Sequence, residues 1–207
     1  GDSHRGYRVV GTSSEYFKRF RYRRDIPLQF MEGQKFSDLF DAVLGADVAR
    51  TLNYKIGDEI VLAHGTGPIS IGKDHGDTPF RVSGILASTG TPVDKAVHVS
   101  MEAIEAIHIG WETGNFSDQG NQKSVENLRK MDLSPKAVTA MYVGLKTKMS
   151  IFSLQRWINT YPQEPIIAIL PGIVFGELWS MIGNVEKVLL FVSAMVVFTA
   201  ILGMIIS

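Results

Sequence analysis

The C-terminal end of the sequence carries the feature that most constrains the fold, a run of nineteen residues, 188–206, without a charged side chain. A transmembrane helix needs about 20 mostly apolar residues to cross roughly 30 Å of hydrocarbon, and this run is long enough. A buried core helix is the alternative, but core helices seldom remain uncharged on every face over such a length. We therefore predict a transmembrane helix that includes Val188, Leu189, Phe191, Val192, Val196, Phe198, Ile201, Leu202 and Ile205.

The residues before this run predict an amphipathic connecting helix over 171–187. Pro171 suits the first position of a helix, where its missing N–H is not needed. Gly183 is the one weak point, and no proline follows Pro171. Such a helix either carries motion between an outer domain and the bilayer or packs its apolar side on that domain, and the two interpretations are compatible. The apolar positions recur at helical spacing, at Val174, Leu178, Ile182 and Val185.

The composition excludes several functional classes. The 207 residues carry 21 basic and 21 acidic side chains, whereas nucleic-acid binders carry a basic excess because neutralising phosphates supplies their affinity. Without cysteine, the chain forms neither disulfides nor thiolate metal sites. The N-terminal stretch GDSHRGYRVVG lacks the apolar region of a signal peptide. We expect the chain to be a segment of a longer protein, with no nucleic-acid partner.

Residues 1–170 have mixed polarity and predict an α/β domain. Helices are expected after Ser13 or Ser14, after Gly45 and over 101–111. The Gly-rich segment GTGPISIGKDHGDT lies between two predicted strands and suggests a mostly β subdomain. A strand–helix–strand order in 138–170 predicts a βαβ unit and a mixed or parallel sheet. Residues 112–135 are polar and predict an exposed insertion. The other predicted strands cover residues 7–11, 42–44, 59–63, 79–86 and 96–100.

The sequence offers no constellation that supports catalysis. His64, Asp74, His75 and Asp77 bracket the Gly-rich segment, but their spacing matches no metal-ligand pattern. The stretch GTGPISIG lacks the Gly-Lys-Ser/Thr ending of a phosphate loop, and neither G-x-S-x-G nor H-E-x-x-H occurs. We therefore predict no catalytic residue, no cofactor and no metal site.

A basic cluster begins on the first predicted helix, which covers residues 15–23. Its members are Lys18, Arg19, Arg21, Arg23 and Arg24. Two interpretations stay open, a solvated face or a contact surface for anionic lipid headgroups or an acidic partner.

Three segments, in this order, resemble MacB-type and FtsX-like ABC transporter permeases. AVLGADVARTLNYKIGDEIVL is similar to a signature of their periplasmic core domain, and FRVSGILASTGTPVDKAVHVSMEAIEAI is similar to the part that follows it. LWSMIGNVEKVLLFVSAMVVFTAILGMIIS resembles their second transmembrane helix. The resemblance covers most of residues 7–111 and 138–207 and leaves out the polar insertion.

The resemblance implies an extracytoplasmic domain over 1–170, with a porter-like βαβ subdomain beside a smaller, mostly β subdomain. It implies a permease of the bacterial inner membrane that is not itself an enzyme. The expected partners are an ABC ATPase subunit, a second permease copy in a homodimer or heterodimer, and a periplasmic partner protein. ATP hydrolysis in the partner would move the periplasmic domain for transport or export, which is mechanotransmission. A membrane-anchored scaffold that binds and regulates a partner protein is the alternative.

Overall fold

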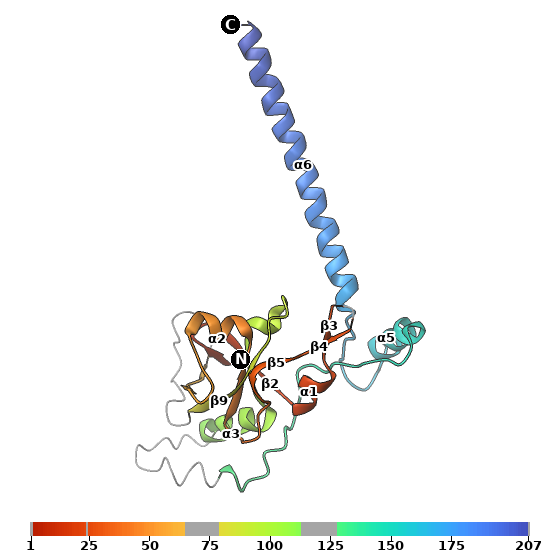
Figure 1. Ribbon diagram of the computed structural model, residues 1–207. Coiled ribbons are helices and arrows are strands. Elements are labelled where there is room, and N and C mark those ends of the chain that lie inside the picture. The colour runs from red at the N-terminus through yellow and green to blue at the C-terminus, as the bar shows by residue number, and fades with distance from the viewer. Residues whose placement is uncertain (1, 24, 65–78, 113–127, 207) are drawn as a thin grey trace. The chain divides into compact units, whose positions relative to one another are not determined.

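The computed structural model describes residues 2–23, 25–64, 79–112 and 128–206 (Figure 1). The chain divides into two compact units, Gly1–Thr139 and Ala140–Ser207. The first unit contains a mixed sheet with helices, and the second contains a long apolar helix. The mixed α/β class with a C-terminal apolar helix is therefore confirmed, and each unit is described by itself below.

Within the described part of the first unit, eight strands form one sheet in the order β5-β9-β6-β10-β2-β1-β8, and β7 pairs with β9 beside this path. Two pairs, β6 with β9 and β10 with β2, are parallel, and the others are antiparallel. The connection between the parallel strands β6 and β9 includes helix α2 (Ala46–Leu52), as parallel strands require a crossover. The strands are β1 (Asp2–His4), β2 (Tyr7–Thr12), β5 (Phe30–Gly33), β6 (Asp41–Leu44), β7 (Glu59–Ile60), β8 (Ala63–His64), β9 (Phe80–Leu86) and β10 (Ala96–Ser100).

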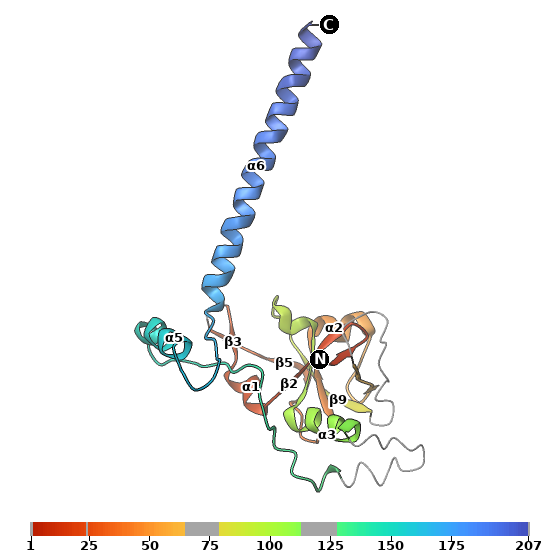
Figure 2. The same cartoon turned by 180° about the vertical axis from the view of Figure 1, so that it is seen from behind.

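Helices of the first unit cover both faces of this sheet. Helices α2 and α3 (Met101–Glu112) lie toward opposite ends of the strands (Figure 1 and Figure 2) and pack on the same face, whereas α1 (Ser14–Arg19) packs on the other. Helices α2 and α3 contribute to one apolar cluster, and α1 contributes to a second one. Successive residues of a strand point to opposite faces. Accordingly Ala42 and Leu44 lie in the first cluster and Val43 lies in the second.

The central strands follow the sequence prediction closely. Phe80 and Val82 are fully buried, and Arg81 between them is exposed. The single strand predicted over 59–63 is instead two short strands, because β7 pairs with β9 and β8 pairs with β1. The polar insertion predicted over 112–135 is described only at its ends, and its last part departs from the prediction. Leu128 packs against the core and Leu133 is buried in it.

Residues 140–170 differ from the prediction. They contain a 3-10 turn, η2 (Lys148–Ser150), and α5 (Ile151–Asn159), but no strand among the described residues. A strand is stable when a neighbour satisfies its backbone N–H and C=O groups, and no described strand pairs with this segment. Met141, Tyr142 and Val143 are consequently exposed. The two strands predicted within 138–170 are not formed, and the parallel pairs lie elsewhere.

Candidate functional site

Helix α6 (Pro171–Ile206) holds the residues assigned to membrane insertion and to coupling. It is continuous over 36 residues, which is about 54 Å at 1.5 Å per residue. Its residues Val185–Ile205 are long and apolar enough to cross a membrane, and none of this stretch is buried inside the protein. Those 21 residues measure about 31 Å, close to the roughly 30 Å hydrocarbon core of a bilayer.

The N-terminal part of α6 precedes this span. Residues 171–184 extend the helix by about 21 Å beyond it. Gly183 has no atom within 4 Å of the position that a Cβ would take, so the helix accommodates alanine there. The predicted coupling residues share one helical face and are each roughly half exposed, and they are Val174, Leu178, Ile182 and Val185.

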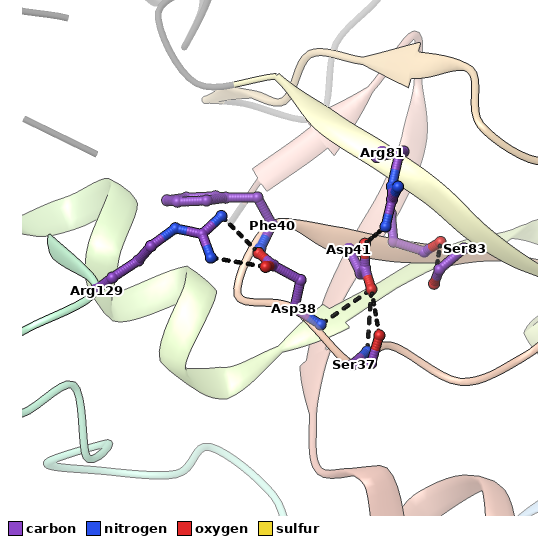
Figure 3. Close-up of polar contacts among 8 residues, drawn as sticks. Ser37, Asp38, Phe40, Asp41, Arg81, Ser83 and Arg129 are labelled. Carbon is purple, nitrogen blue, oxygen red and sulfur yellow. Dashed lines mark hydrogen bonds and ion pairs between the residues drawn. The ribbon is translucent and has the colours of Figure 1, made fainter. Parts of the chain in front are cut away.

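In the first unit, a polar turn before β6 is the most connected group of side chains that Figure 3 shows. The carboxylate of Asp41 is almost fully buried and accepts hydrogen bonds from the backbone N–H of Ser37 at 3.0 Å and of Asp38 at 3.0 Å. The Ser37 hydroxyl donates to it at 3.2 Å, and Nη2 of Arg81 lies 3.4 Å from its other oxygen. This carboxylate therefore closes the turn that starts β6, because its acceptor sites are taken by these donors.

A second carboxylate of this turn, Asp38, binds Arg129 in a bidentate pair. Nη1 and Nη2 of Arg129 donate to the two carboxylate oxygens at 2.6 and 2.9 Å. The hydrogen bond from Arg129 is the main reason that the pKa of Asp38 lies below its ordinary value. The pair ties residues 128–133 to the turn. Because both side chains are partly exposed, it contributes only modestly to stability.

A shallow depression of about 430 Å³ lies beside the turn. Its mouth carries the exposed guanidinium of Arg81, and exposed Ile56 forms part of its wall. Asp41 lines it as well, but that carboxylate is already satisfied. The depression thus offers one cation and some apolar surface. Its hydroxyl–carboxylate pair, Ser37 with Asp41, belongs to the turn, because the same carboxylate oxygen also accepts two backbone N–H groups.

The loop Ser88–Asp94 is held by a third carboxylate. Asp94, only 3% exposed, accepts from the N–H of Thr89 at 2.8 Å, the N–H of Gly90 at 2.8 Å and the hydroxyls of Thr89 and Ser88. Burial alone raises the pKa of Asp94, but these hydrogen bonds outweigh it and place the pKa below its ordinary value. The loop ends in η1 (Pro92–Lys95), whose carbonyls lie so close to Gly45 that a Cβ at Gly45 would clash with them.

His98 and His4 contact backbone carbonyls and aromatic side chains of the folded unit. His98 is buried between Val43, whose carbonyl lies 3.3 Å from Nδ1, and the rings of Tyr16 and Phe17. Burial lowers its pKa to about 4, although the Val43 carbonyl opposes the shift. His4 contacts the Val61 carbonyl at 2.7 Å and the Tyr54 hydroxyl at 2.9 Å.

Metal binding is not apparent in the part of the chain that the structure describes, where no three His, Asp or Glu side chains converge. One group of candidate metal ligands in the sequence lies around the Gly-rich segment. Asp74, His75 and Asp77, together with the side chain of His64, fall outside the described residues. The prediction that they form no metal site therefore stays a prediction.

The polar turn was missed by the sequence reasoning. Ser37, Asp38 and Asp41 lie directly before a buried strand, and such Ser/Asp clusters often form turns in which the side chain accepts backbone N–H groups. That local signal was present. The contribution of Arg129, ninety-one residues away from Asp38, had no local signal.

A mixed α/β unit together with a helix long and apolar enough to span a bilayer is the combination typical of a membrane-anchored protein with a folded domain outside the membrane. The family model of the MacB-like periplasmic core domain matches residues 1–160, and the chain belongs to this family. The domain is therefore extracytoplasmic, and the chain is a component of an ABC transporter of the permease type, whose family is not itself catalytic. No curated protein matches the sequence.

Proposed function

We propose that the chain is part of a permease subunit that couples ATP hydrolysis in a partner ATPase to motion of its periplasmic domain, for transport or export. Helix α6 carries this proposal. It is one uninterrupted helix over Pro171–Ile206 and includes both the candidate span and about 21 Å of helix beyond it. A shift or rotation of the span within the bilayer is passed along a continuous helix, because a sharp kink would require an interruption of its backbone hydrogen bonds.

The proposed partners follow from the same mechanism. An ABC ATPase subunit supplies the energy for the motion. A second permease copy supplies the opposing half, and a periplasmic protein receives the motion. We place this assembly in the bacterial inner membrane, with residues 1–170 on the periplasmic side, 171–187 as the connecting helix and 188–206 as the transmembrane helix.

The test is Gly183→Pro in the full-length protein in its membrane. Proline in a helix interior removes a backbone hydrogen bond and clashes with the preceding turn, at a cost of about 3 kcal/mol or more. Residue 183 lies just before the span, so the break falls between the span and the part of α6 beyond it. We expect normal protein level in the membrane and normal co-purification of the ATPase, but loss of the transport-dependent phenotype.

Two further variants make the result decisive. Gly183→Ala keeps the helix and meets no neighbouring atom, so it should retain function. Ile182→Gly creates a Gly-Gly pair that weakens the helix by about 1 kcal/mol without a steric clash, so it should reduce function partially. Full function in both Gly183→Pro and Ile182→Gly means that α6 is only an anchor.

The alternative is a membrane-anchored scaffold that binds and regulates a partner protein. The exposed aromatic side chains Phe152 and Trp157 of α5 favour it, because exposed Trp and Phe are typical of protein-binding surfaces. Pull-down of the full-length protein from membranes separates the two functions. An ATPase among the bound proteins supports the permease, and a soluble partner without an ATPase supports the scaffold.

A further inference from the structure

The basic cluster of the sequence takes a defined form in the first unit. Lys18 and Arg19 end α1, and the chain then forms a separate two-stranded sheet of β3 (Arg21–Tyr22) and β4 (Ile26–Pro27). Arg21 pairs in register with Pro27, and Tyr22 pairs with Ile26. We call Lys18, Arg19, Arg21 and Arg23 the basic hairpin. Its four side chains bring a high local positive charge to a chain whose formal net charge is zero.

Two of these cations are engaged within the hairpin. Nε of Arg19 donates to Glu15 at 2.7 Å. Nη1 of Arg21 donates to the carbonyl of Lys18 at 2.6 Å and to that of Phe20 at 3.1 Å, and Nε of Arg21 lies 3.7 Å from Asp25. Arg21 therefore holds the carbonyl end of α1 and fixes the geometry of the hairpin.

The other two cations are presented to solvent. Lys18 and Arg23 are exposed. The guanidinium of Arg23 lies 6.0 Å from the centroid of the Tyr22 ring, and its Nη2 lies 3.5 Å from the position that a Cβ would take at Gly90. Arg23 has a φ of 53°, which is unusual for a residue other than glycine, asparagine or aspartate.

We propose that the basic hairpin binds the anionic phosphate headgroups of the bilayer in which the protein is anchored. The positive charge is complementary to anionic lipid, and each Lys or Arg near such a surface strengthens attraction about fivefold. Ile26, an exposed apolar residue of the same hairpin, suits the boundary between headgroups and acyl chains. The span keeps the hairpin at high local concentration near lipid, so a weak contact is sufficient. An acidic protein as the ligand would match the positive charge of the hairpin, but it would leave the exposed Ile26 without a role.

The test uses the full chain in nanodiscs and exploits the absence of cysteine. Ile26→Cys carries an environment-sensitive fluorophore, and lipids with a spin label on the headgroup quench it on contact. Lys55→Cys, in an exposed turn of the same unit, is the control position. We expect quenching at position 26 in discs that contain phosphatidylglycerol and little in phosphatidylcholine alone. It should disappear in 1 M NaCl, where the screening length is about 3 Å.

The variants remove the two cations that make no structural hydrogen bond. Lys18→Gln with Arg23→Asn lowers the equilibrium between bound and free hairpin by about 25-fold, and asparagine tolerates the positive φ at position 23. Lys55→Gln with Lys95→Gln removes the same charge elsewhere and should leave the quenching intact. If circular dichroism shows that the double variant is misfolded, Lys18→Gln alone is measured, with a reduction of about fivefold expected.

Three outcomes would overturn the proposal. Equal quenching in both lipid mixtures means that charge does not direct the contact. An equal loss with the control pair means that net charge alone matters, not the hairpin. Binding of soluble poly-glutamate to the hairpin without quenching in phosphatidylglycerol discs means that the surface serves an acidic protein instead.

Discussion

Asp94→Ala tests whether one carboxylate holds the loop Ser88–Asp94 and, through it, the packing at Gly45. The carboxylate accepts from two backbone N–H groups and two hydroxyls. Thr89 is only 2% exposed, so its N–H loses its acceptor where water hardly reaches, and its hydroxyl keeps only the Thr91 hydroxyl at 2.7 Å as an acceptor. A buried donor left unsatisfied costs about 1–3 kcal/mol, whereas the donor at the exposed Gly90 finds water. We therefore expect a loss of roughly 2–4 kcal/mol in the free energy of unfolding.

The assay is urea unfolding of the chain in mild detergent, followed by near-ultraviolet circular dichroism, with hydrogen exchange at Thr89 and Gly90. Asp94→Asn keeps one acceptor oxygen and should lose about half as much stability, because its NH₂ group faces the remaining donors. Asp132→Ala removes an exposed carboxylate that binds only Ser134 and should change nothing measurable. A loss below about 1 kcal/mol for Asp94→Ala, with unchanged exchange at both amides, would refute the reasoning.

Two further predictions concern stability. His98 has a pKa of about 4 in the folded chain and 6.5 in the unfolded chain, so the unfolded chain binds more protons between these two values. The contribution of His98 to the free energy of unfolding is therefore complete above pH 6.5 and falls by about 3 kcal/mol as the pH decreases toward 4. His98→Phe should flatten that part of the stability profile in acid titration, and an unchanged profile would contradict the prediction. A chain that ends at Leu170 should fold cooperatively in water and be monomeric or weakly dimeric, because the described buried core residues all lie at or before Leu133. An unfolded spectrum for that chain, beside a folded one for the full chain in detergent, would show that the two-part interpretation is wrong.

Local pattern was sufficient for the central strands and for α6. Phe80, Arg81 and Val82 alternate in burial as the sequence predicts, because a strand's side-chain period is two whatever its partners are. Helix α6 was predictable for a similar reason. A run without charges forms a helix in the bilayer because its backbone hydrogen bonds must be made internally.

The same kind of pattern failed at 138–170, where alternation was present but strand partners were not. A helix satisfies its backbone within one segment, but a strand depends on a neighbour that may be far away in sequence. The small strands β1, β3 and β5 show the converse, since pairing creates them where the sequence has little β pattern. The formation of these short strands was therefore beyond local reasoning.

The sequence by itself determined the long apolar helix α6, the buried strands β6, β9 and β10, and the family, because each depends on residues that lie close together along the chain. Tertiary structure alone decided which arginine side chain pairs with each carboxylate of the polar turn. Asp41 meets Arg81 across forty residues and Asp38 meets Arg129 across ninety-one, and only the folded sheet brings these charges together. Arg19 and Arg21 of the basic cluster, by contrast, are engaged by partners no more than four residues away along the chain. A hydrogen bond forms only over a few ångströms, so a pair far apart in sequence depends on the fold that brings its two members together.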